Sequence, residues 1–205
     1  MKTYPSILRS VRGRKATHRL HLFDKLDGSN LRFEWSRKVG WERFGTRHRV
    51  IDESHPVFGS AFELFGRTLA DPIARVALDQ GWDALVAFGE LWGPGSLGGR
   101  HVPEEPKRIT LFDVAPYRRG FVGPQRFLEL FGDLDVPAYL GEHDWDDTLV
   151  AQVRRGELPG ITVEGVVGKA GEGHRMRMAK AKTQAWVDRI LAQFGEEEGR
   201  RLVQS

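Results

Sequence analysis

Short segments in which polar and apolar side chains alternate recur along this chain of 205 residues, and segments with helical spacing lie between them. Residues 18–24 and 31–36 alternate in this way, whereas 84–92 and 109–114 are short apolar runs typical of buried strands. Its 24 glycines and 10 prolines separate these segments. We expect one globular domain, residues 1–205, with a mixed α and β fold rather than a helical bundle or a solenoid.

Four segments have the apolar spacing of helices, and glycine or proline bounds most of them: 60–80, 124–131, 146–155 and 186–194. Residues 60–80 are expected to form two short helices, with Asp71 capping the second and Gly81 ending it. Gly195 is expected to end the closing helix, whose apolar stripe we assign to the core.

The first two strand-like segments are joined by Lys25-Leu26-Asp27-Gly28-Ser29-Asn30, which contains an amine, a carboxylate and a glycine turn. Because Asp27-Gly28 is a favoured turn pair, the two strands are expected to pair as a hairpin-like unit. Lys25 then stands at the junction of a strand and a turn, where a side chain is held rigidly while it faces a cleft.

Composition restricts the setting in which the protein works. The chain has no cysteine, so neither disulfides nor thiolate metal sites contribute, and a cytoplasmic location is expected. No apolar run approaches the roughly 20 residues that cross a bilayer, so we expect no membrane partner. Residues 1–20 carry six basic residues and no acid, which favours a polyanionic partner, with an organelle transit peptide as the alternative.

Three carboxylates interrupt apolar strand patterns: Glu90, Asp113 and Glu164. A buried carboxylate is costly unless it is paired or hydrogen-bonded, so each either belongs to a site or faces solvent on an alternating strand. Lys180 and Lys182 are two residues apart in a strand expected over 173–182, so both side chains leave the same face.

These side chains fit the transfer of a nucleotide to lysine. A lysine amine, with a reference pKa of about 10.4, becomes a good nucleophile when burial or neighbouring cations lower its pKa. The two lysines of 173–182 supply such cations beside Lys25 and neutralise phosphate oxygens. Glu164 suits Mg²⁺, which binds one or two carboxylates together with waters and phosphates. Phe112 or Phe88 offers a ring for base stacking, and Glu90 accepts hydrogen bonds from ribose hydroxyls.

In their order and spacing these segments resemble the six motifs of the covalent nucleotidyltransferase superfamily, which includes ATP-dependent ligases and messenger-RNA capping enzymes. The matching segments, which span most of the chain, are Lys25-Leu-Asp-Gly-Ser-Asn30, Thr46-Arg47, Phe88-Gly-Glu-Leu91, Leu111-Phe-Asp-Val114, Glu164-Gly-Val-Val167 and Lys180-Ala-Lys182. Lys25 takes the position of the lysine that becomes nucleotidylated. Arg49 is the alternative to Arg47.

Within the superfamily the pattern is most similar to RNA ligases that seal nicks in duplex RNA. Asn30 stands where DNA ligases and capping enzymes usually have arginine, and the opening Lys-Thr-Tyr-Pro-Ser-Ile is also similar to that type. The resemblance implies an α+β fold of antiparallel sheets flanked by helices, with a nucleotide cleft between the sheets. It also implies a role in RNA repair, in which ATP and Mg²⁺ or Mn²⁺ are used to join RNA with 3′-OH and 5′-phosphate ends.

The resemblance also assigns roles to residues. Lys25, Lys180 and Lys182 are implied to be catalytic, and Glu164 to bind the metal. The implied nucleotide-binding residues are Asp24, Asp27, Asn30, Arg47, Glu90, Phe112 and Asp113. Among them Glu90 is expected at the ribose, the ring of Phe112 on adenine, Asp113 in support of the site and Asp24 near the base.

Only 23 residues follow Lys182, so the C-terminal domain of most ligases and capping enzymes is not expected here, and a partner chain or homodimer would replace it. Three alternatives remain on the same scaffold: a DNA-end ligase, a GTP-using capping-type enzyme and an enzyme that only adenylylates. A basic nucleic-acid-binding module without catalysis is the alternative of another class. The glycine-rich segment 93–100 lacks the lysine of a phosphate-binding loop and is expected to be a mobile loop beside the cleft.

Overall fold

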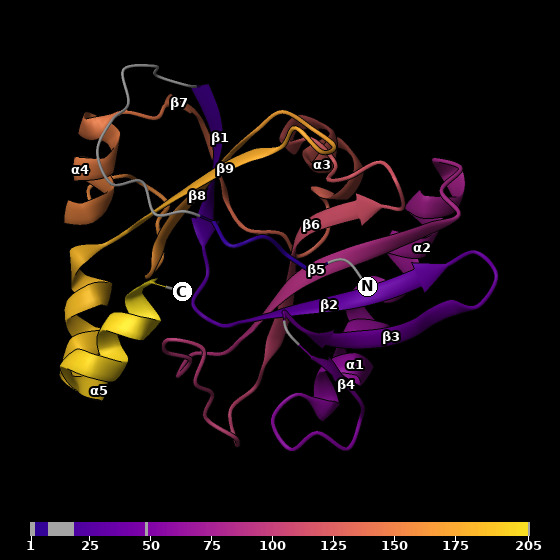
Figure 1. Cartoon of the computed structure of the whole chain (residues 1–205), viewed down its shortest axis with the longest axis horizontal. Coiled ribbons are helices and arrows are strands. Elements are labelled where there is room, and N and C mark those ends of the chain that lie inside the picture. The colour runs from indigo at the N-terminus through magenta and orange to yellow at the C-terminus, as the bar shows by residue number, and fades with distance from the viewer. Residues whose placement is uncertain (1–2, 8–18, 48, 205) are drawn as a thin grey trace. The chain divides into compact units, whose positions relative to one another are not determined.

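The computed structural model describes residues 3–7, 19–47 and 49–204 (Figure 1). A polyanionic partner was predicted from the basic residues near the N-terminus. Most of these lie outside the described residues, among them Arg9, Arg12, Arg14 and Lys15. The chain forms two compact units. The first unit contains Gly28–Val136, Glu172–Met176 and the segment that ends at Tyr4, and the second contains the segment that ends at Asp27, Pro137–Gly171 and the chain from Arg177 onward.

The first unit contains a five-stranded antiparallel sheet in the order β4-β3-β2-β5-β6. Its strands are β2 (Ser29–Ser36), β3 (Gly40–Thr46), β4 (Val50–Ile51), β5 (Ala84–Trp92) and β6 (Arg108–Pro116). Its helices are α1 (Gly59–Phe65), one π-helical turn (Gly66–Ala70), α2 (Asp71–Asp79) and α3 (Pro124–Phe131). Phe33 of β2 stacks on Phe65 of α1 with ring centroids 3.8 Å apart. The alternation of β2 therefore buries one face in the core and turns Asn30, Arg32 and Glu34 to the other.

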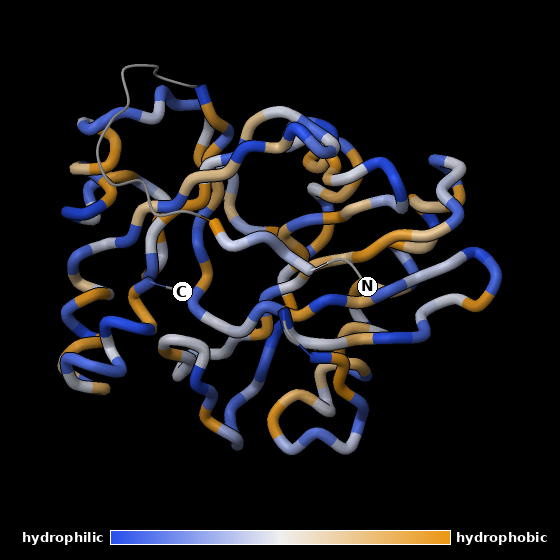
Figure 2. The backbone as a smooth tube through the Cα atoms, viewed as in Figure 1, coloured by the Kyte–Doolittle hydropathy of each residue, from blue (hydrophilic) through white to orange (hydrophobic). Residues whose placement is uncertain are grey.

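The second unit contains a four-stranded antiparallel sheet in the order β7-β1-β8-β9. Its strands are β1 (Arg19–Lys25), β7 (Tyr139–Asp144), β8 (Gly165–Ala170) and β9 (Arg177–Lys182). Its helices are α4 (Asp147–Arg155) and α5 (Gln184–Gln204). Leu20 and Leu22 of β1 form an apolar cluster with Leu149 of α4, so Phe23 and Lys25 occupy the opposite face of the sheet. In Figure 2 much of β5 in the first unit has the colour of hydrophobic residues, in agreement with its apolar sequence.

The α+β class with antiparallel sheets and flanking helices is confirmed. The predicted strands near 18–24, 31–36, 84–92 and 109–114 are present, as are helices near 124–131 and 146–155. Gly81 and Gly156 follow helices in left-handed conformations, with φ of 64° and 69°, as their positions predicted. No helix in the described part of the chain is long and apolar enough to cross a membrane.

Several local predictions were wrong. The strands before and after Lys25 do not pair with each other, because β1 pairs with β7 and β8 whereas β2 pairs with β3 and β5. Asp71 does not cap a helix, because the π-helical turn carries the helical backbone straight into α2. Glu164 immediately precedes its strand instead of interrupting it. The closing helix breaks at Gly195 as predicted, but helical structure resumes and reaches Gln204.

Candidate active site

The register of the second sheet places three predicted segments in one row. Lys25, the last residue of β1, is opposite Gly165, the first residue of β8, and Gly165 is opposite Lys182, the last residue of β9. Since neighbouring strands lie about 4.8 Å apart, the two lysines flank the start of β8. Gly165 has φ of 146°, and a Cβ there would lie 2.1 Å from the Ala181 carbonyl oxygen, so glycine is required.

Glu164 links the two lysines through both carboxylate oxygens. Its Oε2 is 2.7 Å from Lys25 Nζ and its Oε1 is 2.9 Å from Lys182 Nζ. Burial raises the pKa of Glu164, but the two ammonium groups outweigh burial and the pKa is lowered overall. Burial likewise lowers the pKa of Lys182, and the carboxylate of Glu164 offsets only part of that effect. The site thus contains a buried anion between two cations.

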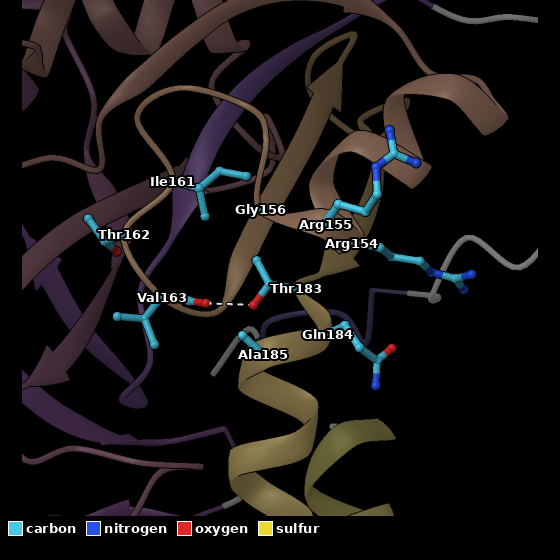
Figure 3. Close-up of a pocket in the computed structure, with 9 residues that line it drawn as sticks. All are labelled: Arg154, Arg155, Gly156, Ile161, Thr162, Val163, Thr183, Gln184 and Ala185. Carbon is cyan, nitrogen blue, oxygen red and sulfur yellow. Dashed lines mark hydrogen bonds between the residues drawn. The ribbon is translucent and has the colours of Figure 1, made fainter.

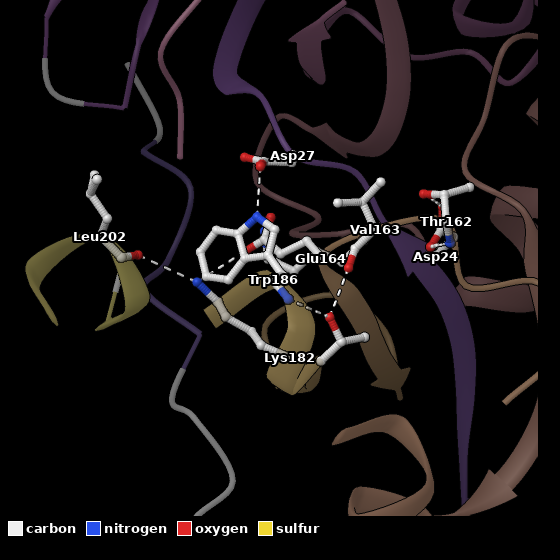
Figure 4. Close-up of polar contacts among 10 residues, drawn as sticks. Asp24, Asp27, Thr162, Val163, Glu164, Lys182, Trp186 and Leu202 are labelled. Atoms are coloured by element: carbon white, nitrogen blue, oxygen red, sulfur yellow. Dashed lines mark hydrogen bonds and ion pairs between the residues drawn. The ribbon is translucent and has the colours of Figure 1, made fainter. Parts of the chain in front are cut away.

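The backbone at Glu164 and just before it is held by hydrogen bonds with Asp24 and Thr183, and Figure 4 shows the side-chain bonds among them. The carboxylate of Asp24 accepts bonds from the amide and hydroxyl of Thr162, at 3.0 and 2.7 Å. Thr183 Oγ1 donates to the Val163 carbonyl at 2.8 Å, and the Thr183 amide donates to the Glu164 carbonyl at 2.9 Å. Burial raises the pKa of Asp24, although the bonds from Thr162 lower it in part. The structure therefore gives Asp24 a contact with the segment before Glu164, and its contact with a base stays a prediction.

Trp186 of α5 contacts two of the predicted segments at once (Figure 4). Its indole Nε1 donates to Asp27 Oδ2 at 2.6 Å, and Lys182 Nζ lies 4.3 Å from the centroid of its ring. The same ammonium also donates to the Leu202 carbonyl at 3.5 Å. The sequence interpretation assigned Trp186 only to the core, because its place in an apolar stripe concealed the indole donor. Its position four residues after Lys182 was the feature of the sequence that could have indicated a place beside the site.

Lys180 and Lys169 extend the row of lysines along the same sheet face. Lys180 is opposite Val167, which is itself opposite Phe23, so these three side chains share the face of Lys25. Both lysines are buried, and Lys169 Nζ lies 5.1 Å from the centroid of the Phe23 ring. Lys169 was not predicted as a site residue, although it lies two residues beyond Val167 on an alternating strand.

The remaining predicted residues lie in the first unit, on or beside the face of its sheet that is opposite the hydrophobic core. Asn30 and Glu90 are cross-strand partners on β2 and β5. The register of β5 and β6 shifts at Phe88, which pairs with Asp113 and leaves Phe112 as the extra residue of a bulge. A bulge re-aims a side chain, and here the ring of Phe112 lies beside a tyrosine.

That tyrosine is Tyr4, a third residue, after Trp186 and Lys169, that the motifs did not predict. Its hydroxyl donates to Asp113 Oδ2 at 2.5 Å, and its ring lies edge-on to Phe112 with centroids 5.0 Å apart. Burial raises the pKa of Tyr4 well above its ordinary value, and the charge of Asp113 raises it further. Tyr4 belongs to the opening segment that was similar to RNA ligases, which was the signal for it.

Two predicted residues carry buried atoms with unmet hydrogen-bonding capacity. Within the described part of the chain, Asn30 Oδ1 and Arg47 Nε have no hydrogen-bond partner. Nearly all buried polar atoms in folded proteins are paired, so such atoms call for an explanation, and a bound ligand is one. Arg47 is half-buried and its carbonyl accepts a bond from Arg32, whereas Arg49 is exposed.

The structure also contains a groove of about 550 Å³ in the second unit, at the end of α4 and the start of α5 (Figure 3). It is lined by Arg154, Arg155, Gly156, Ile161, Thr162, Val163, Thr183, Gln184 and Ala185. None of the predicted site residues lines this groove. It borders the segment before Glu164 and is distinct from the row of lysines.

No cluster of three or more histidine, aspartate or glutamate side chains fit for a metal ion occurs among residues 3–7, 19–47 and 49–204. A metal held entirely by protein ligands therefore has no support in that part of the chain. Glu164 offers the single carboxylate of the other known arrangement, in which waters and substrate phosphates complete the shell of a divalent cation, but in this structure both of its oxygens contact lysine ammonium groups.

Comparison with known proteins agrees with the fold described above. No family model matches the sequence, and no curated protein matches it either. Among solved structures, a variant of Naegleria gruberi RNA ligase with AMP and Mn is similar with a TM-score of 0.62 at 14% identity, over 91% of this chain and 59% of that one. Another variant of the same ligase, with ATP and Mn, has a TM-score of 0.61 at 16% identity, over 83% and 51% of the two chains.

A third structure of that ligase, with PPi, is similar with a TM-score of 0.59 at 15% identity, over 83% of this chain and 51% of that one. The chain thus spans between about half and three fifths of the length of these ligases. At this level of identity the likeness concerns the fold. The chain shares its fold with these RNA ligase structures.

Proposed function

We propose that this protein is an ATP-dependent RNA ligase that joins 3′-OH and 5′-phosphate RNA ends through a lysyl-AMP intermediate. The observation that carries the proposal is the contact of Glu164 with both Lys25 and Lys182, at 2.7 and 2.9 Å. Residues from three distant segments converge there, in a fold shared with RNA ligases. The preference for RNA over DNA rests on Asn30 and on the identity of the structural neighbours.

The proposed reaction has three balanced steps. In the first, Lys25 Nζ loses a proton and forms a bond to the α-phosphorus of ATP, while the bond from that phosphorus to the pyrophosphate oxygen breaks. In the second, an oxygen of the RNA 5′-phosphate attacks the same phosphorus and the bond to Lys25 breaks. In the third, the 3′-hydroxyl attacks the 5′-phosphorus, loses its proton, and AMP leaves.

The lysines and Glu164 serve the first step through position and charge. Glu164 holds Lys25 Nζ at a fixed point, and its lowered pKa keeps it anionic at neutral pH. Lys182 and Lys180 are proposed to contact the phosphates, where fixed cations stabilise the charge that develops in the transition state. Mg²⁺ or Mn²⁺, when bound with ATP at Glu164, supplies further neutralisation of phosphate charge.

The nucleoside contacts are proposed from the resemblance. Their support is that Asn30, Glu90 and Asp113 lie on one face of the sheet of the first unit, opposite its hydrophobic core. Phe112 would stack on adenine, Glu90 would bind ribose hydroxyls, and Asp113 would support the site through Tyr4. Asn30 Oδ1 and Arg47 Nε, which have no hydrogen-bond partner among the described residues, would form hydrogen bonds with the nucleotide. Asp24 and Asp27 complete the proposed set.

Incubation with α-labelled ATP or GTP, followed by denaturing electrophoresis, tests the first step. Label retained on the wild-type chain from ATP, and absent from Lys25→Ala, is expected. Label from GTP in place of ATP would indicate a capping-type enzyme, and no label would sink the proposal in favour of a non-catalytic binding module. Glu164→Ala is expected to form no lysyl-AMP, and a normal rate in Mg²⁺ would remove Glu164 as the metal ligand.

The acceptor is tested with 5′-phosphorylated strands offered to the adenylylated protein. Nicked RNA duplex, broken RNA loops, single-stranded RNA and the matching DNA ends are compared under one condition. Sealing of RNA but not DNA is expected. Transfer of AMP to the 5′ end without sealing would indicate an adenylylation-only enzyme, and addition of a candidate partner chain would then show whether sealing requires one. A cytoplasmic role in RNA repair completes the proposal.

A further inference from the structure

Two turns of the first unit meet at its surface. Residues 117–120 follow β6, and residues 172–176 lie between β8 and β9 (Figure 1). Phe121 and Gly173 exchange two backbone hydrogen bonds, of 3.2 and 2.7 Å. A Cβ on Gly120 would lie 2.3 Å from the carbonyl carbon of Gly173, so this close approach requires glycine. The two turns are therefore held in a defined arrangement.

The side chains on these turns are basic and aromatic. We call the following set the arginine platform: Tyr117, Arg118, Arg119, His174 and Arg175. All five are exposed, and Tyr117 is exposed to 65% although tyrosine usually buries its ring. The guanidinium carbon of Arg118 lies 5.1 Å from the centroid of the Tyr117 ring, and a ring nitrogen of His174 lies 3.3 Å from the Arg118 carbonyl oxygen.

The charge of the arginine platform is not neutralised by carboxylates of the described residues. Across residues 3–7, 19–47 and 49–204, no carboxylate forms an ion pair with Arg118, Arg119 or Arg175. Arginines elsewhere on the surface do pair, as Arg200 does with Glu196 at 2.7 Å. Glu172, the one acid of the two turns, is exposed and leaves a net positive charge.

The backbone of Arg118 is unusual. Its φ is 62°, which makes it the one non-glycine residue with positive φ among those that the structure describes. Residues with a Cβ rarely adopt this conformation, and they persist in it where the surrounding structure determines it. The Arg119 amide donates to the Pro116 carbonyl at 3.1 Å across this turn, and an arginine occupies a position where glycine or asparagine would be less strained.

We propose that the arginine platform binds a single-stranded segment of RNA. Guanidinium groups match phosphate oxygens in charge and geometry, and an exposed aromatic ring accepts a base by stacking without regard to sequence. The combination of Tyr117 with three unpaired arginines suits a chain of alternating bases and phosphates. An acidic protein surface or an anionic membrane offers the charge but no base. The proposal rests on the proposed function only in naming RNA as the polyanion.

Fluorescence anisotropy with labelled single-stranded oligoadenylate tests the proposal without ATP. The triple variant Arg118→Ala, Arg119→Ala, Arg175→Ala is compared with a control of equal charge, Arg75→Ala, Arg200→Ala, Arg201→Ala. The platform variant is expected to weaken binding at least tenfold more than the control. It should also reduce the slope of log Kd against log salt by about 2, since each phosphate contact on a single strand contributes about 0.7.

Tyr117 provides the second arm of the test. Tyr117→Ala should weaken binding about tenfold while Tyr117→Phe retains it, because stacking needs the ring and not the hydroxyl. Equal losses for the platform and control triple variants would overturn the proposal. Polyglutamate or anionic phosphatidylserine vesicles that bind as tightly as RNA, with the same dependence on the platform arginines, would overturn it in favour of a general anion surface.

The two proposals fail separately. The platform variants are expected to form lysyl-AMP at the wild-type rate, because none of their residues belongs to the proposed catalytic set, and to be impaired only when RNA is the acceptor. A wild-type chain that forms no lysyl-AMP but binds oligoadenylate through the platform would remove the ligase proposal and leave this one standing. If the chain binds and seals RNA equally well without the platform, the platform proposal falls and the ligase proposal stands.

Discussion

Substitution of Glu164 by glutamine should expose the energetic role of the buried carboxylate. In the wild-type chain Glu164 is paired with Lys25 and Lys182, and the side chain of Lys182 is only 1% exposed. The amide of glutamine fills the same volume without charge, so the Lys182 ammonium becomes an uncompensated buried charge. Breaking a buried pair in this way typically costs about 3–5 kcal/mol, a large part of the roughly 5–15 kcal/mol that stabilises an ordinary protein.

Urea denaturation measures that cost. With a slope of about 2 kcal/mol per molar urea, the midpoint of E164Q should fall by about 2 M. The deficit should shrink as pH rises. The pKa of Lys182 is already lowered in the folded chain, and without Glu164 it falls further below its unfolded value of 10.5. At pH values between the pKa of Lys182 in the folded chain and its pKa in the unfolded chain, the unfolded chain binds more protons than the folded one. The free energy of unfolding therefore increases with pH in that range.

The double variant Glu164→Gln, Lys182→Met is the matched control. Methionine has nearly the length of lysine without its charge, so the double variant should regain most of the stability that E164Q loses. A wild-type midpoint for E164Q at pH 7, or no recovery in the double variant, would refute the view that Glu164 compensates a buried cation.

Three further predictions concern single residues. Trp186→Phe keeps a ring beside Lys182 but removes the donor to Asp27, and it should slow lysyl-AMP formation about tenfold, the order expected for a hydrogen bond to a charged group. In a chain that already carries Asp27→Ala, Trp186→Phe should cause no further slowing in single-turnover assays. Gly165→Ala should disrupt β8, because its Cβ would collide with a β9 carbonyl, and circular dichroism melting should show a marked loss of stability. Burial lowers the pKa of His101 below its ordinary 6.5, so stability should fall as pH drops from 6.5 through the lowered value, and His101→Gln should flatten that dependence in urea titrations at several pH values.

Local patterns were enough to place the individual site groups. The alternation of 18–24 placed Lys25 at the end of a strand, which β1 confirms. The spacing of Lys180 and Lys182 predicted a shared face, and the register of β9 against β8 agrees with it. These predictions succeeded because the two-residue period of a strand is a property of neighbouring residues. The roles of the residues, by contrast, came from the order of the motifs and await the experiments above.

Predictions failed where a residue's surroundings come from distant parts of the chain. Asp27-Gly28 has the composition of a hairpin turn, but it connects strands of two different sheets, since β1 pairs with β7 and β8 whereas β2 pairs with β3 and β5. Trp186 fits an apolar stripe and is indeed buried, yet its indole nitrogen serves Asp27. The periodicity of a helix identifies a buried face but not the polar atoms that this face meets.

The sequence alone determined a mixed α and β fold, the strand that carries Lys25 and the shared face of Lys180 and Lys182, since each follows from spacing within a few residues. Only the tertiary structure decided that Glu164 pairs with Lys25, 139 residues away, that Trp186 meets Asp27 across 159 residues, and that Tyr4 contacts Asp113. Such contacts depend on the pairing order and register of strands, which are set by the packing of the whole chain and not by any local pattern.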